Sequence, residues 1–151
     1  MKLKWTSNKG EPLETSPCMR FFMNLEVLVA AVKQNREMLD KLNLNSDAIV
    51  CNQDIEGETG EFNFRYQGHN VRWMNFKEKG VGLNRNNALM RATGDICLIG
   101  DDDVTYDDDY VKTVTTAFKE NPTADVILFN VHPNENYKPF ECKKKFRVRR
   151  R

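Results

Sequence analysis

Apolar residues along the chain recur with two different periods, and stretches of the two kinds alternate. Five short runs have the composition of strands buried on both faces: residues 25–31, 47–52, 71–76, 95–100 and 125–131. Between them apolar residues recur every three or four positions, which predicts three helices: residues 35–42, residues 84–93 and a helix that starts near Tyr110. This alternation is typical of a three-layer α/β domain with a mostly parallel sheet.

One antiparallel pair is also expected. Turn-forming residues from Gln67 to Asn70 separate two β-rich runs, so a hairpin should attach to the strand at 71–76.

The two ends of the chain differ from its middle. Residues 1–22 mix Pro, Gly, Ser and charge without a period, which predicts an N-terminal appendage before a domain at 23–133 and a basic tail at 134–151. The net charge is +1, but seven basic residues lie in 143–151, so residues 1–142 hold 16 basic and 22 acidic residues, a net charge of −6. Such a tail could bind an anionic membrane surface, and we expect a membrane surface as its partner rather than nucleic acid.

Composition places the chain among globular proteins, with 40% hydrophobic and 30% charged residues. The apolar run at 25–32 is interrupted by Glu26 and is far shorter than the roughly 20 residues of a membrane-spanning helix. Without a signal-peptide pattern, we expect a cytoplasmic protein, or one held at the inner membrane face by its tail. No CxxC pair suggests zinc, and Cys51 and Cys97 are expected to be small buried hydrophobic residues.

Six aspartates crowd into nine positions after the run at 95–100, as the triplets 101–103 and 107–109. The second triplet precedes the expected helix at Tyr110, where aspartate side chains can cap free N–H groups, so we expect Asp107 or Asp108 to be a cap. The first triplet follows a strand, at the edge where open α/β sheets bind ligands. Carboxylates there can hold a hard divalent cation, which favours a metal site at Asp101 and Asp103.

A glycine-containing loop precedes the expected helix at 84–93. Gly80 and Gly82 loosen the backbone, Asn84 is the expected cap, and Arg85 lies in the first turn, where anionic groups are favoured. A dinucleotide fingerprint is a poor match, because Arg85 occupies the position of its third glycine.

The stretch "GVGLNRNNALMRATGDICLIGDDDVTYDDDY" resembles the central motif of family 2 glycosyltransferases with the GT-A fold. In that motif a glycine and an arginine-asparagine pair open a helix, an alanine-x-glycine-acid element follows, and a strand delivers an aspartate-x-aspartate motif. The resemblance implies a Rossmann-like nucleotide-binding half and extends, less strongly, from about Met23 to Val131.

The resemblance also implies roles for individual residues. Asp101 would contact the ribose or the metal, Asp103 would coordinate Mn²⁺ or Mg²⁺ bridging a nucleotide-sugar diphosphate, and Asp102 would be the variable middle residue. Arg85 would approach the base or phosphate, beside the loop at Gly80.

Two other loops depart from the family pattern. After the first strand the sequence is "AAVKQN", so contacts to the nucleoside would come from backbone starting at Ala30, or from Gln34. The second strand ends in "CNQD", so Asn52, Gln53 or Asp54 would replace the usual base-reading aspartate.

The family's acceptor half, with its general base, normally follows the donor half, and Glu135 and Glu141 are weak candidates for that base. We therefore expect the donor-binding part of a truncated transferase, whose acceptor would be a glycan or a lipid-linked sugar, with its catalytic residues unknown. Two alternatives stay open. One is a non-catalytic module that binds nucleotide or nucleic acid, and the other is a phosphatase like the haloacid dehalogenases, with Asp101 as its nucleophile.

Overall fold

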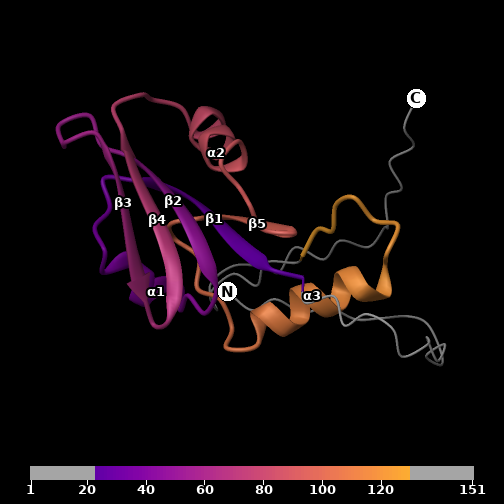
Figure 1. The fold of residues 1–151 in the computed structure, drawn as a ribbon. Helices are drawn as coiled ribbons and strands as arrows, with labels where there is room; N and C mark the ends of the chain where they lie inside the picture. The colour runs from indigo at the N-terminus through magenta and orange to yellow at the C-terminus, as the bar shows by residue number, and fades with distance from the viewer. Residues whose placement is uncertain (1–22, 130–151) are drawn as a thin grey trace, which may run out of the picture.

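A five-stranded sheet forms the centre of the computed structural model, which describes residues 23–129 (Figure 1). The strand order is β3-β4-β2-β1-β5. The strands are β1 (Leu25–Val32), β2 (Asp47–Gln53), β3 (Gly60–Tyr66), β4 (His69–Phe76) and β5 (Ile96–Asp101). β1 pairs in parallel with β2 and β5, β2 pairs in parallel with β4, and only the β3–β4 pair is antiparallel. The predicted parallel sheet is confirmed.

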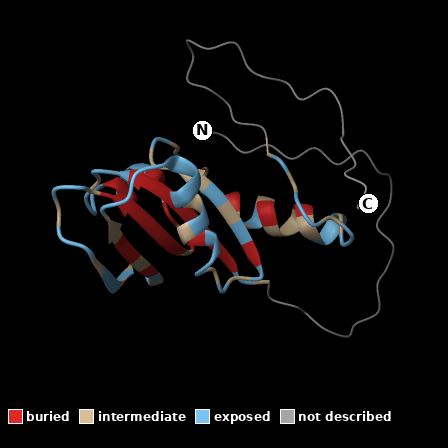
Figure 2. Cartoon of the chain, turned by 90° about the horizontal axis from the view of Figure 1, so that it is seen from above, coloured by how far each residue is buried: buried red, intermediate tan, exposed pale blue. Residues whose placement is uncertain are grey.

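Helices cover both faces of this sheet and complete three layers. They are α1 (Met38–Leu42), α2 (Val81–Leu89) and α3 (Tyr110–Glu120). One face of β1, with Val27 and Val29, shares a core with α1 and α3, whereas Leu28 on its other face shares a smaller core with Ala88 of α2. Figure 2 shows the buried residues concentrated in the central strands. The predicted α/β class is therefore confirmed.

The predicted hairpin is also present, as β3 and β4. Its two-residue turn is formed by Gln67 and Gly68, whose φ angles are 48° and 88°. Two positive φ angles are the requirement of a type I′ turn, which matches the twist of the strands it joins.

Two predicted helix starts were wrong. α2 begins at Val81 after Gly80, whose φ of 135° suits glycine, so Asn84 lies inside the helix and does not cap it. α1 begins at Met38, because Asn35 forms a turn whose side-chain Oδ1 accepts from Glu37 N at 3.0 Å.

The predicted strand at 125–131 was wrong over the residues that the structure describes, 125–129, which have no strand. No described strand pairs with this segment, so its backbone lacks a ladder partner, and Val126 and Leu128 are 75% and 85% exposed. Residues 130 and 131 lie outside the described part.

The loop at residues 92–95 leads from α2 to β5 and is hydrogen-bonded to the start of β1. Glu26 of β1 is buried, and its Oε2 accepts from the N–H groups of Thr93 and Gly94 at 2.7 and 3.1 Å. Its Oε1 accepts from Arg72 Nη2 at 2.9 Å. A Cβ at Gly94 would lie 2.7 Å from that of Glu26, so glycine is required by close approach.

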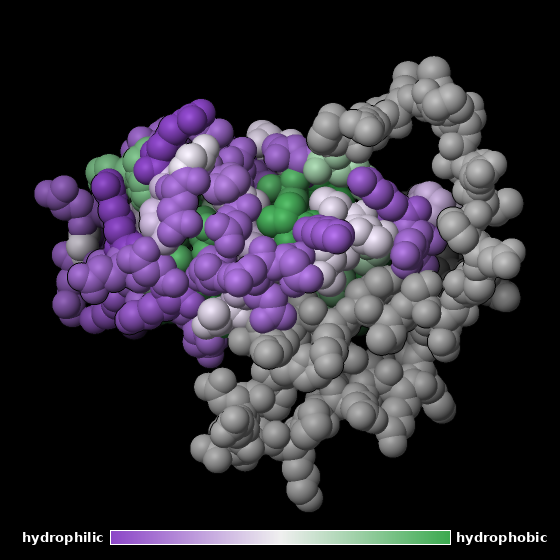
Figure 3. Space-filling model, turned by 90° about the horizontal axis from the view of Figure 1, so that it is seen from below, coloured by the Kyte–Doolittle hydropathy of each residue, from purple (hydrophilic) through white to green (hydrophobic). Residues whose placement is uncertain are grey.

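One face of the described part is largely polar. Figure 3 shows hydrophilic side chains over most of one face, with hydrophobic area confined to small gaps among them. Within residues 23–129 no helix has the length and apolarity to cross a membrane. The predicted appendage at 1–22, the basic tail, Glu135 and Glu141 lie outside the described residues.

Candidate functional site

The carboxyl ends of β1, β2 and β5 meet at a point where the strand order reverses. β1 lies between β2 and β5, with Val32 in register with Gln53 and Ala30 in register with Asp101. The loops after β1 and β5 therefore leave the sheet side by side, which is where doubly wound α/β domains bind their ligands. Most of the residues proposed from the sequence come together at this edge.

Arg85 and Asp101 form an ion pair across the edge. Arg85 Nη2 donates to the two oxygens of Asp101 at 2.6 and 2.8 Å, and the two side chains are 41% and 46% exposed. Such a half-exposed pair adds little stability. The Nε–H of Arg85, in contrast, is buried and has no hydrogen-bond partner among the described residues. The half-exposed guanidinium, bonded to Asp101 only through Nη2, keeps further donor capacity for an anionic or polar ligand.

Asn84 holds Arg85 in this place, and sequence analysis missed that role. The buried Asn84 Nδ2 donates to the carbonyl oxygens of Ala31 at 3.1 Å and Cys51 at 2.8 Å, which pins the first turn of α2 to β1 and β2. Gln53 Nε2 adds a bond to the oxygen of Gly80 at 3.0 Å. These partners are far apart in sequence, so no local pattern signals them.

Asp102 faces the loop after β1. Its Oδ2 accepts from the backbone N–H of Val32 at 3.1 Å and from Gln34 Nε2 at 2.9 Å. Asp102 and Gln34, both predicted as ligand contacts, thus contact one another.

Asp103 is exposed and makes no hydrogen bond or ion pair within the described residues, which leaves its carboxylate available. No group of three or more His, Cys, Asp or Glu side chains in residues 23–129 is arranged to hold a metal ion. The donor set is therefore Asp103 with the half-exposed Asp101. That set fits Mg²⁺ or Mn²⁺ held by one or two carboxylates together with substrate phosphates, and does not fit an all-protein cage.

The second triplet does not cap α3, so that prediction was wrong. Asp109 occupies the cap position without a side-chain cap bond, and Asp107 contributes only its carbonyl, which accepts from Tyr110 N at 3.1 Å. Asp108 turns instead to the loop after α1, where its Oδ1 accepts from Asn43 Nδ2 at 2.8 Å. A tertiary bond to a distant loop has replaced the local one.

The end of β2 offers one accessible candidate. Asn52 and Gln53 are 2% and 8% exposed, and both amides are engaged within the protein. Asp54 is only partly buried, and its Oδ1 accepts from Glu56 N at 3.2 Å. Ala30 is buried within β1, at 7% exposure. Asn52, Gln53, Asp54 and Ala30 remain predictions as ligand contacts.

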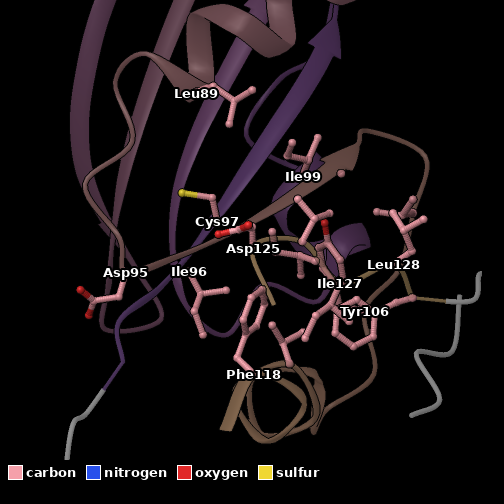
Figure 4. A pocket seen from close by; sticks show the side chains of 16 residues that line it. Leu89, Asp95, Ile96, Cys97, Ile99, Tyr106, Phe118, Asp125, Ile127 and Leu128 are labelled. Atoms are coloured by element: carbon pink, nitrogen blue, oxygen red, sulfur yellow. The ribbon is translucent and has the colours of Figure 1, made fainter. Parts of the chain in front are cut away.

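A separate apolar groove runs along β5 (Figure 4). It has a volume of about 530 Å³, and its walls are β5, α3 and residues 125–129. Tyr106 lines it and is 3% exposed, so burial raises the pKa of its hydroxyl, as do the nearby Tyr110 and Asp101. Neither Arg85 nor the first acidic triplet lines this groove, although Gly100 and Val104, which flank the triplet, do, so the groove adjoins the polar edge without including its charged groups.

The fold and the polar carboxyl edge define a Rossmann-like α/β domain of the GT-A kind. The family model described as "Glycosyl transferase family 2" matches residues 21–150, and the chain belongs to this family. The comparison found no match among curated proteins and none among solved structures. The glycosyltransferase resemblance is thereby confirmed.

Proposed function

We propose that this chain binds a nucleoside diphosphate-sugar at the carboxyl edge of its sheet and takes part in transferring the sugar to a glycan or lipid-linked acceptor. Family membership gives glycosyl transfer in general, with a nucleotide-sugar donor and an acceptor. The observation that carries the finer proposal is the position of Arg85, Asp101 and Asp103 at the switch point between β1 and β5. The non-catalytic and phosphatase alternatives gain no comparable support.

The residues divide into two roles in this proposal. Asp103 and Asp101 would hold Mn²⁺ or Mg²⁺, which when bound would neutralise the diphosphate and stabilise it as a leaving group. Arg85 would orient Asp101 and, through the exposed part of its guanidinium, donate to the phosphate or ribose. Asp54, at the end of β2, is the residue best exposed to accept from the base.

Location and acceptor belong to the same proposal. Attachment to the inner membrane face through residues 143–151 would bring a lipid-linked acceptor near the donor edge.

Calorimetric titration of UDP and of GDP, with and without Mn²⁺, tests the donor site. Asp103→Asn keeps the shape but removes charge from the metal ligand, so nucleotide affinity with Mn²⁺ should fall by about tenfold or more. Affinity without metal should be unchanged, and so should the melting temperature, because the exposed Asp103 makes no hydrogen bond or ion pair within the described residues. Asp109→Asn, an exposed residue of the second triplet, is the matched control.

Two results would count against the donor site. One is that neither nucleotide binds the parent chain at millimolar concentration with Mn²⁺ present. The other is an Asp103→Asn variant that binds as well as the parent.

A further inference from the structure

Two side chains, one at the end of β2 and one after β5, hold Gln34 between them. Asn52 at the end of β2 pairs with its backbone, accepting from Gln34 N at 3.0 Å and donating to Gln34 O at 3.1 Å. Asp102, after β5, accepts from the Gln34 side chain at 2.9 Å. The loop after β1 is therefore fixed between two strands that do not pair with one another.

The Asn52 side of this arrangement is rigid. Asn52 Nδ2 also donates to Asn75 Oδ1 at 3.1 Å, and that oxygen accepts from Trp73 Nε1 at 2.8 Å. Asn52 and Trp73 are 2% and 5% exposed and Asn75 is partly buried, so water has limited access to this chain of bonds. Buried and fully paired polar groups of this kind fix a single conformation.

The Asp102 side depends on one carboxylate oxygen. Oδ2 accepts both from Gln34 Nε2 and from the backbone N–H of Val32, the last residue of β1. Gln34 and Asp102 are both partly buried, and Val32 is 57% exposed, so water can compete at this side. The bonds to Asp102 are thus weaker and more easily broken than the bonds that Asn52 makes to Gln34.

We propose that Asp102 is a positioning residue: it latches the loop Val32 to Gln34 onto the acidic loop and so shapes the wall that the nucleoside meets. This inference rests on the proposed donor site. Asp102 then contacts neither metal nor nucleotide and acts through Gln34, while its neighbours Asp101 and Asp103 face the ligand. A loop fixed before binding loses less entropy when the ligand arrives, so the latch raises donor affinity.

The chemistry of the latch permits a sharp test. Because one oxygen accepts both bonds, an asparagine at 102 can keep them through its Oδ1, whereas alanine removes that acceptor and both bonds. If Asp102 instead acted through its negative charge on a metal, Asp102→Asn and Asp102→Ala would lose nucleotide affinity equally. Asp102→Asn and Asp102→Ala in the full chain therefore separate an acceptor role from a charge role.

Titration of UDP, with and without Mn²⁺, is the first measurement. We expect Asp102→Ala to weaken binding about tenfold, by the same factor in both conditions, and Asp102→Asn to stay within about threefold of the parent. Asp109→Ala, a truncation in the second triplet, should bind as the parent does. Gln34→Ala combined with Asp102→Ala should lose no more than Asp102→Ala alone, since the two act as a unit.

Amide hydrogen exchange by NMR is the second measurement and needs no ligand. Loss of the Asp102 acceptor should speed exchange at Val32 by about fivefold to tenfold, while Gln34, bonded to Asn52 through its backbone, changes less. Asp102→Asn should leave both rates near those of the parent.

The outcomes distinguish the latch from the donor site. Unchanged Val32 exchange in Asp102→Ala, or unchanged UDP affinity, overturns the latch alone. Equal losses in Asp102→Asn and Asp102→Ala would assign the residue to the metal and also overturn it. A parent chain that binds neither UDP nor GDP removes the donor site, and the latch falls with it.

Discussion

Side-chain amides, more than charges, organise the carboxyl edge of this domain. The Asn52 side chain bonds to the N–H and the carbonyl of Gln34, as a paired strand residue would. The Asn84 side chain donates to carbonyls near the ends of β1 and β2. Each amide supplies bonds where the regular ladder stops, so strand-end carbonyls stay satisfied without water. The two residues hold the framework on which Arg85 and the acidic loop are displayed.

Replacing Asn84 by Ala tests this framework at the residue scale. It strips a buried donor from the carbonyls of Ala31 and Cys51, so the free energy of unfolding should fall by about 1–3 kcal/mol. Asn86→Ala, on the exposed side of the same helix, should change it by less than about 0.5 kcal/mol. Urea denaturation of both variants is the measurement, and equal losses would rule out the bridging role.

At the scale of elements, local patterns predicted what local forces determine. The apolar runs of β1, β2 and β5, the Gln67–Gly68 turn and the apolar stripe of α3 all appear where their spacing placed them. The wrong roles of Asn84 and Asp108 arose where a distant partner decides: Asn84 is 53 residues from Ala31, and Asp108 is 65 residues from Asn43. No pattern in the neighbouring sequence predicts either bond.

The candidate site was predictable to a similar extent. The position of the first acidic triplet at a strand's carboxyl end was evident from the sequence, because the strand itself was. The partners of that triplet were not, since the pairing of Asp102 with Gln34 joins residues 68 positions apart.

The end of β5 packs tightly on the loop that leads to α3. A Cβ at Gly100 would overlap the hydroxyl of Tyr106, which is buried and has no hydrogen-bond partner among the described residues. Gly100→Ala should therefore lower the free energy of unfolding by about 1–3 kcal/mol. Tyr106→Phe removes an unpaired polar group and should be neutral or slightly stabilising.

The double variant decides whether this contact is the cause. Without the hydroxyl, the added methyl group has room, so Gly100→Ala/Tyr106→Phe should recover most of the stability that Gly100→Ala loses. Thermal and urea denaturation of the two single variants and the double variant give the coupling. Strictly additive effects would mean that Gly100 is required for another reason.

At the scale of the whole molecule, both cores contain weak acids that the fold keeps neutral. Cys51 lies in the core under α2, where burial raises the pKa of its thiol to about 11. Tyr106 and Tyr110 stack in the core under α1 and α3, with ring centroids 4.7 Å apart, and burial raises the pKa of both hydroxyls. Alkaline pH should therefore weaken the packing of the helices on both faces of the sheet.

The sign of that effect follows from proton counting. Between a pKa of 9.0 for the exposed thiol and about 11 in the folded chain, the folded state retains a proton that the unfolded state releases. The stability linked to Cys51 is thus fully present below pH 9 and is lost as pH rises toward 11, with a slope of up to about 1.4 kcal/mol per pH unit.

Cys51→Ala should be less stable at pH 7 yet show a flatter decline from pH 9 to 11. Ile49→Val, a truncation in the same core without a titrating group, should keep the parent's slope. Urea denaturation at several pH values compares the three chains, and a parental slope in Cys51→Ala would show that the thiol is not the group responsible.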